Sequence, residues 1–177
     1  MKNKIKELQQ RLKIYTTRGR WKHVDNFHLT LKFLGEISPS QQIQIDDALR
    51  KLCIAKKPFS LKLTGLGKFE GKDTIRVLWL GLTGDIQELH SLHKEINKVL
   101  DRLGFPLEKR KFSPHITIGQ NIIFECPFDQ IKNEIEKIQF DWIEVDNLFL
   151  FKSEQVGHKR VYSKISEYDF SKGKKHM

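Results

Sequence analysis

Two segments of the chain place apolar residues at helical spacing on one face. The face carries Ile5, Leu8 and Leu12 in residues 2–13, and Leu89, Leu92 and Ile96 in residues 86–103. The three successive pairs are each offset by 84 positions. Asp85, with Glu88 three residues on, is a candidate N-cap for the second segment, and Gly104 is a candidate stop signal. The pattern predicts two amphipathic helices that are copies of one element.

A second helix and two strands are predicted after each of these helices. Ser38-Pro-Ser-Gln has the pattern of a capping box and precedes an apolar stripe of Ile45, Ala48, Leu49 and Leu52. Its counterpart starts at Pro127 and is expected to bury Phe128, Ile131, Ile135 and Ile138. The expected strands are residues 59–66, 74–82, 140–151 and 159–166.

Between the two helices of each copy lies a short stretch that contains His-x-Thr. The two stretches are Phe27-His-Leu-Thr-Leu-Lys-Phe-Leu and Phe112-Ser-Pro-His-Ile-Thr-Ile. We therefore expect a duplicated α+β unit that forms a bilobal single domain over residues 1–170. Residues 67–73 and 152–159 are expected to be loops that fringe a central groove, and residues 171–177 a flexible basic tail.

Strand alternation predicts which side chains of these stretches share a face. Leu29, Leu31 and Phe33 are expected in the core, with His28, Thr30 and Lys32 on the opposite face. In the second stretch Ile116 and Ile118 are expected in the core, His115 and Thr117 opposite them, and Gly119 is expected to leave open space beside that pair.

A pair of histidines with neighbouring hydroxyls suits phosphoryl chemistry. Histidine gives or takes a proton near neutral pH, so His28 and His115 could act as acid and base on opposite sides of one phosphorus. Thr30 and Thr117 could then donate hydrogen bonds to its non-bridging oxygens. A single His-x-Thr is a weak signal, but its repetition in register favours a catalytic site.

Composition agrees with a phosphate-containing partner. The 177 residues include 32 Lys+Arg and 22 Asp+Glu, so the formal charge is +10, and the sequence pI of about 9.6 favours polyanions. No stretch approaches the ~18 apolar residues of a membrane span. The N-terminus lacks the apolar stretch of a secretory signal, so we expect a cytoplasmic protein that does not bind membranes.

The remaining candidate ligands and nucleophiles favour structural roles. Cys53 and Cys126 match neither a disulfide framework nor a zinc pattern, and we expect both to be packing residues. His90 and His93 are three residues apart on a predicted helix, but no accompanying ligand set is visible in the sequence. No metal or other cofactor is expected.

The residues His28-Leu-Thr-Leu-Lys-Phe-Leu-Gly and Pro114-His-Ile-Thr-Ile-Gly resemble the paired HxTx motifs of the two-histidine phosphoesterases. Further similarity is to the bacterial and archaeal RNA 2′,3′-cyclic phosphodiesterase branch, also named LigT-like or 2′-5′ RNA ligases. It is carried by Trp21, Asn26, Gly67, Phe69, Arg76-Val-Leu-Trp79, Ser153, Gly157 and Tyr162. The resemblance runs from about Lys4 to Ile165.

The resemblance implies a bilobal α+β domain with two antiparallel-rich sheets lining a central cleft and helices outside. It implies a monomeric hydrolase, without cofactor, that opens the 2′,3′-cyclic phosphate at an RNA 3′ end to a 2′-phosphate. By position, His28 would donate the proton to the leaving 3′ oxygen, and His115 would activate water. Thr30 and Thr117 would hold the phosphate.

The sequence departs from this branch at two places. Gly119-Gln120 stands where an Ala-Arg pair usually follows the second motif. The strand that the branch carries before its first helix has no counterpart ahead of residues 2–13. We expect its place to be empty, which would expose a sheet edge or an apolar strip, or to be filled by other residues or by a neighbouring chain. Two alternative functions stay open: a catalytically weak RNA-binding protein, and a phosphodiesterase of small cyclic nucleotides.

Overall fold

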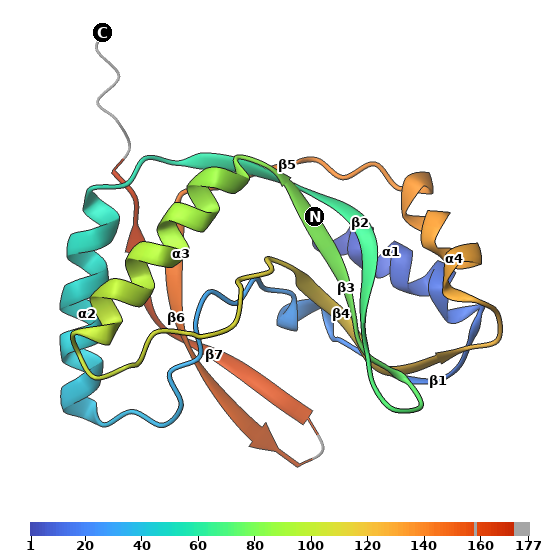
Figure 1. The fold of residues 1–177 in the computed structure, drawn as a ribbon, viewed down its shortest axis with the longest axis horizontal. Helices are drawn as coiled ribbons and strands as arrows, with labels where there is room; N and C mark the ends of the chain where they lie inside the picture. The colour runs from blue at the N-terminus through green and yellow to red at the C-terminus, as the bar shows by residue number, and fades with distance from the viewer. Residues whose placement is uncertain (158, 172–177) are drawn as a thin grey trace, which may run out of the picture. The chain divides into compact units, whose positions relative to one another are not determined.

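The computed structural model of the protein describes residues 1–157 and 159–171. They form two compact units of an α+β fold (Figure 1). Unit 1 is made of Met1–Thr30, Leu61–Gly84 and Ser113–Ile143, and the other described residues form unit 2. Each unit therefore draws on both halves of the duplicated sequence, and both His-x-Thr motifs fall in unit 1.

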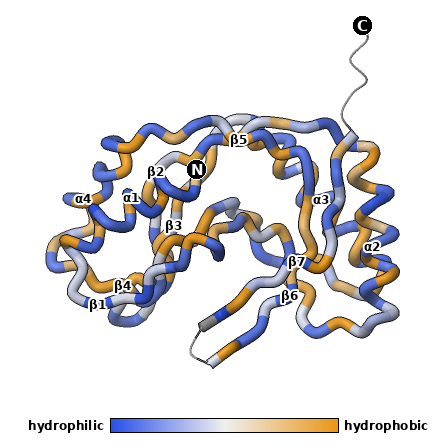
Figure 2. The backbone as a smooth tube through the Cα atoms, turned by 180° about the vertical axis from the view of Figure 1, so that it is seen from behind, coloured by the Kyte–Doolittle hydropathy of each residue, from blue (hydrophilic) through white to orange (hydrophobic). Residues whose placement is uncertain are grey.

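The predicted helices are present. Among the described residues the α-helices and 3-10 helices are α1 (Lys2–Lys13), η1 (Val24–Asn26), α2 (Pro39–Ile54), α3 (Ile86–Asp101), α4 (Phe128–Ile131) and η2 (Lys132–Lys137). The capping box at Ser38 is confirmed, because its hydroxyl accepts from the Gln41 N–H while the Gln41 side chain accepts from the Ser38 N–H. Hydrophobic and hydrophilic residues alternate along these helices in Figure 2, as burial of one face requires.

The strands form one large sheet and one ribbon. A five-stranded sheet has the order β1-β4-β3-β2-β5, and β6 pairs with β7 in an antiparallel ribbon. The pairs β1–β4, β4–β3 and β3–β2 are antiparallel. The strands are β1 (Thr16–Trp21), β2 (Phe59–Glu70), β3 (Ile75–Gly84), β4 (Ile116–Phe124), β5 (Trp142–Val145), β6 (Asn147–Val156) and β7 (Lys159–Asp169).

Each unit has its own core. In unit 1, α1 and η2 cover one face of the sheet, and Ile5, Leu8 and Leu12 are fully buried there, as the periodicity predicts. In unit 2, α2 and α3 pack together, and α2 also packs against β7. Cys53 is buried in this second core, and burial raises the pKa of its thiol to about 11, so the predicted packing role is confirmed for it.

Several predicted boundaries are wrong, for identifiable reasons. The 140–151 strand is two strands, β5 and β6, which belong to different sheets. The expected loop 67–73 is mostly strand, because β2 continues to Glu70 in pairing with β3. The expected loop 152–159 is likewise short, since β6 runs to Val156 and β7 starts at Lys159.

Two local predictions also fail. Asp85 does not cap α3 with its side chain; its carboxylate accepts instead from the backbone N–H of Ser60 at 2.8 Å. Phe33 is 78% exposed. The backbone pairing of its segment lies at Leu29 and does not extend to Phe33, so strand alternation no longer decides where this side chain points. The predicted stop at Gly104 is confirmed by its positive φ of 89°. The tail predicted at 171–177 lies, apart from Ser171, outside the described residues.

Candidate active site

One backbone bridge brings the two His-x-Thr motifs together. Leu29 pairs with Ile116 in an isolated antiparallel bridge, on the same side of β4 as β1. In antiparallel register the flanking residues also face each other, so His28 lies across from Thr117 and Thr30 across from His115. Directly opposed Cβ atoms in such pairs are about 4.5–5.5 Å apart. The four motif side chains therefore form one cluster.

This cluster lies on the face of the sheet that points away from the core of unit 1. Phe27 is buried in that core and Leu29 packs against it, which turns His28 and Thr30 to the other side. Ile116 and Ile118 are buried, as predicted. All four motif side chains are half-buried, so they remain accessible to a ligand.

A bulge in β4 changes which residues join this face. Trp79 pairs with Thr117, but Leu78 pairs with Gly119, so one residue of β4 is extra between the two pairs. The expected open space at Gly119 is therefore wrong: a Cβ there would lie 3.1 Å from the Ile122 side chain, on the core side. Gln120, opposite Val77, is turned to the same face as Thr117.

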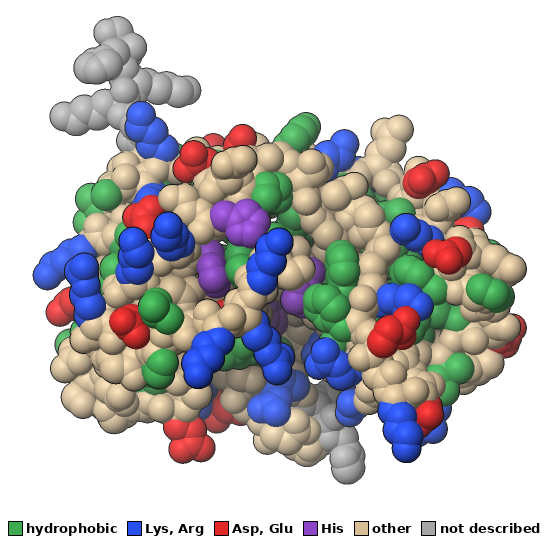
Figure 3. Space-filling view, in the orientation of Figure 1, with side chains coloured by type: hydrophobic (Ala, Val, Ile, Leu, Met, Phe, Trp, Pro, Cys, Tyr) green, Lys and Arg blue, Asp and Glu red, His purple; other side chains and the backbone are tan. Residues whose placement is uncertain are grey.

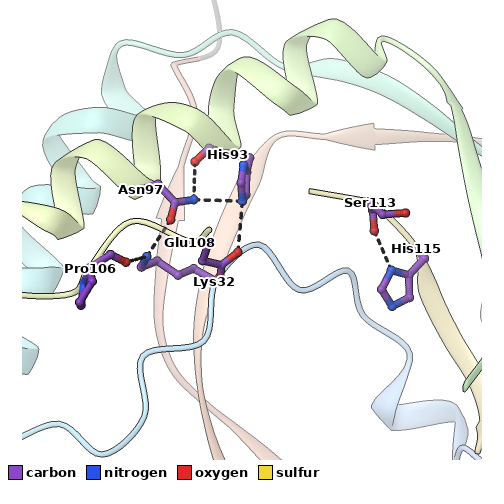
Figure 4. A network of polar contacts seen from close by, with 7 residues as sticks. All are labelled: Lys32, His93, Asn97, Pro106, Glu108, Ser113 and His115. Atoms are coloured by element: carbon purple, nitrogen blue, oxygen red, sulfur yellow. Dashed lines mark hydrogen bonds and ion pairs between the residues drawn. The ribbon is translucent and has the colours of Figure 1, made fainter. Parts of the chain in front are cut away.

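His115 is held in one orientation by its own backbone. Its Nδ1 lies 2.7 Å from the carbonyl oxygen of Ser113 (Figure 4). A carbonyl only accepts, so Nδ1 carries the proton in the neutral ring, and Nε2 is left as the basic nitrogen. This arrangement suits a group that takes a proton from water.

An aromatic wall supports the ring of His115. Phe69 meets it edge to face at 5.2 Å between centroids, and Trp79 lies 6.0 Å away. The Trp79 ring has room in this position because it lies over Gly67, which has no side chain. A Cβ at Gly67 would come within 2.2 Å of the indole. The indole Nε1 is buried and has no hydrogen-bond partner among the described residues. The resemblance had drawn attention to these three residues, but not to their contact with His115.

His28 has a different electrostatic environment. Burial lowers the pKa of its imidazole, a hydrogen bond to the backbone of Asn26 opposes that shift, and the positive charge of Lys22 adds to it. Asn26 ends η1, the short helix that leads into the motif. The lowered pKa favours the neutral form of His28 in the free protein, and a bound anion would favour its protonated form.

Gln9, on α1, fixes the backbone where the motif strands meet, a role that the sequence pattern did not predict. Its amide is buried and donates two 2.9 Å hydrogen bonds, to the carbonyl oxygens of Lys22 and Ile118. The Lys22 carbonyl lies directly after β1, and the Ile118 carbonyl lies in the bulge of β4. Gln9 is a polar residue within the apolar stripe of α1, and this pattern in the sequence could have identified it as a buried hydrogen-bonding residue.

The other candidate residues have structural surroundings in unit 2. Lys32 donates 2.7 Å hydrogen bonds to Asn97 and to the Pro106 carbonyl oxygen, and Asn97 also contacts His93 (Figure 4). The ring of Phe112 stacks on His93 at 3.9 Å and meets His90 edge-on. In the part of the chain that the structure describes, no three His, Cys, Asp or Glu side chains group as metal ligands.

The surface carries the excess positive charge of the sequence. Lysine and arginine side chains are spread over the face drawn in Figure 3. Within the described residues, no helix is long and apolar enough to cross a membrane.

Comparison with known proteins gives consistent relatives. An RNA 2′,3′-cyclic phosphodiesterase of Thermotoga maritima is 31% identical over 175 residues, which cover 98% of this chain and 91% of that protein. A protein of the same name from Geobacillus stearothermophilus is 35% identical over 108 residues, 61% of this chain but only 34% of the relative. The matched segment thus spans about a third of that relative.

The fold is also shared with a solved structure. E. coli LigT, crystallised with 3′-AMP, superposes with a TM-score of 0.76 at 21% identity, over 97% of this chain and 93% of that one. The model of the LigT like phosphoesterase family matches twice, at residues 1–79 and 80–162, which agrees with the duplication inferred from the 84-residue offset. The chain belongs to the family of LigT-like phosphoesterases.

Proposed function

We propose that the protein hydrolyses the 2′,3′-cyclic phosphate at the 3′ end of RNA, leaving a 2′-phosphate and a 3′-hydroxyl. The observation that carries the proposal is the Leu29–Ile116 bridge, which gathers both histidines and both threonines on one face of unit 1. The names of the relatives support the choice of RNA cyclic phosphates as the substrate class.

The proposed reaction needs two proton transfers. Water attacks the phosphorus and gives its proton to Nε2 of His115, which the Ser113 carbonyl leaves available. The bond from phosphorus to the 3′ oxygen breaks, and His28 donates the proton that this oxygen takes up. The hydroxyls of Thr30 and Thr117 donate to the non-bridging oxygens and stabilise their charge.

The substrate itself helps to charge the proposed acid. His28 has a lowered pKa in the free protein, chiefly through burial. A cyclic phosphate monoanion beside the ring would stabilise the imidazolium, which raises the pKa again. The acid is therefore formed most readily in the complex, where its proton is used.

Two other functions are separated from this one by a single set of assays. A phosphodiesterase of small cyclic nucleotides would hydrolyse 2′,3′-cyclic mononucleotides in preference to RNA. A catalytically weak RNA-binding protein would bind RNA ends without turning them over; Gln120, on the same face as Thr117, favours this alternative.

The test offers cyclic-phosphate-terminated RNA and a 2′,3′-cyclic mononucleotide to the protein, with and without excess chelator. We expect faster conversion of the RNA, to a product with a 2′-phosphate, and equal rates with chelator present. Unchanged RNA after prolonged incubation, with binding intact, would establish the binding protein instead. A preference for the mononucleotide would establish the small-molecule enzyme.

A further inference from the structure

A single arginine extends the site face beyond the four motif residues. Arg20 lies on β1 directly opposite Gln120 of β4. Its neighbour Trp21 pairs with Gly119 and packs on the core side, so alternation turns Arg20 to the face that carries Thr117 and Gln120. The guanidinium therefore belongs to the same surface as the cluster of histidines and threonines.

The side chain of Arg20 has no structural task within the described residues. It is exposed, and neither an ion pair nor a hydrogen bond links it to another described side chain. Some other basic residues of unit 1 do have carboxylate partners, as Lys4 has Asp141 and Arg11 has Glu7. An unpaired guanidinium beside a phosphate site is well suited to bidentate contact with a phosphate.

Arg20 lies at a distance along the sheet from the position where Thr117 would hold the reacting phosphate. Thr117 and Gln120 are three residues apart along β4, or roughly 7–10 Å at the rise of a strand, and Arg20 is one further strand away at about 4.8 Å. At this separation, a phosphate group that met Arg20 would be a second one, one step along the substrate. A mononucleotide has no such group.

We propose that Arg20 binds the phosphodiester that joins the last two nucleotides of the RNA, and so selects RNA ends over mononucleotides. The proposal rests on the proposed function for the identity of the substrate. It concerns binding, however, and binding is measured without turnover.

The test compares two probes that are not hydrolysed. One is a fluorescently labelled RNA pentanucleotide that ends in a 2′-phosphate, and the other is a nucleoside 2′-monophosphate, measured by competition. Arg20→Ala should weaken binding of the pentanucleotide about tenfold. Arg20→Lys should restore part of that loss, and the monophosphate should bind both variants as it binds the wild type.

Salt dependence separates a phosphate contact from a structural effect. Removing one phosphate contact should reduce the slope of log Kd against log salt by about 0.7 for a single strand. The matched control is Lys6→Ala, which removes the same charge from α1, the helix that packs on the other face of the sheet. We expect this control to leave the slope unchanged.

The outcomes are distinct. Equal pentanucleotide affinity in wild type and Arg20→Ala, or equal losses for both probes, would overturn the role of Arg20. Absence of RNA turnover by the wild type, together with the Arg20-dependent affinity, would overturn the proposed hydrolysis and leave the phosphodiester contact standing.

Discussion

Leu29 and Ile116 form the only bridge in the described chain that lies outside the named strands, and it joins the two His-x-Thr motifs. The bridge sits at the end of β4, just beyond the stretch that β1 pairs with. Because it is backbone pairing, it sets the relative register of the two motifs independently of their functional side chains. The motifs are therefore held in register by the backbone, and the side chains of His28 and His115 are not needed for that pairing.

Replacing either histidine by alanine should reduce the rate of RNA cyclic phosphate hydrolysis by about 10²–10⁴-fold, because each replacement removes one proton transfer. The rates are measured under single-turnover conditions. The melting temperature should change little, since both side chains point away from the core. Near-wild-type turnover by His28→Ala would contradict its assignment as the acid.

Gln9→Leu should lower the free energy of unfolding by about 1–3 kcal/mol, because it removes two buried hydrogen bonds and takes the side-chain donor away from the Lys22 carbonyl oxygen, whereas the Ile118 carbonyl oxygen still accepts from the Lys22 N–H. Urea unfolding measures the loss. The matched control is Gln10→Leu at the next, exposed position, where the change should stay within about 0.5 kcal/mol. Equal stability of the two variants would mean that the Gln9 bonds contribute little.

Gly67→Ala should cost about 1–3 kcal/mol of stability, because the new methyl group would overlap the Trp79 ring. It should also lower the rate of hydrolysis, since a displaced Trp79 no longer supports His115. In a Trp79→Leu background the same change should have a much smaller effect on both quantities. If the effects of Gly67→Ala and Trp79→Leu simply add in this double-mutant cycle, the proposed overlap between the new methyl group and the Trp79 ring is wrong.

The sequence predicts most of the site because strand alternation has a period of two and each motif is short. The prediction fails where pairing changes. Alternation continued past Thr30 predicts Phe33 in the core, but beyond Thr30 the backbone no longer pairs with β4. Gly119 and Gln120 exchange faces because of a bulge, which depends on the register with β3 and leaves no mark in the sequence.

Two further features escaped prediction for other physical reasons. The strand β1 has the sequence Thr-Thr-Arg-Gly-Arg-Trp, whose middle is exposed at the edge of the sheet, so no apolar alternation marks it. The division into two units follows long-range contacts that alternate between the sequence halves. The duplication predicts two copies of each element, but the pairing of those elements is decided by tertiary packing.

Stability should depend on pH through His28. Its pKa is lowered in the folded protein, chiefly by burial, from the value of about 6.5 that it has when exposed. The unfolded chain therefore binds more protons between the lowered pKa and about 6.5, and stability increases with pH across that window. The contribution is complete above about pH 6.5 and is lost as the pH falls through the folded-state pKa.

The measurement that isolates this contribution compares unfolding free energies of the wild type and His28→Gln between pH 5 and 7.5. Glutamine keeps a hydrogen-bonding side chain but does not titrate, so the variant should lose less stability on acidification than the wild type does. The control is Gln10→Ala, a substitution of a non-titrating side chain at an exposed position of α1, which should run parallel to the wild-type curve. If the His28→Gln curve runs parallel to the wild type instead, burial does not perturb His28, and its protonation in the complex needs no help from the substrate.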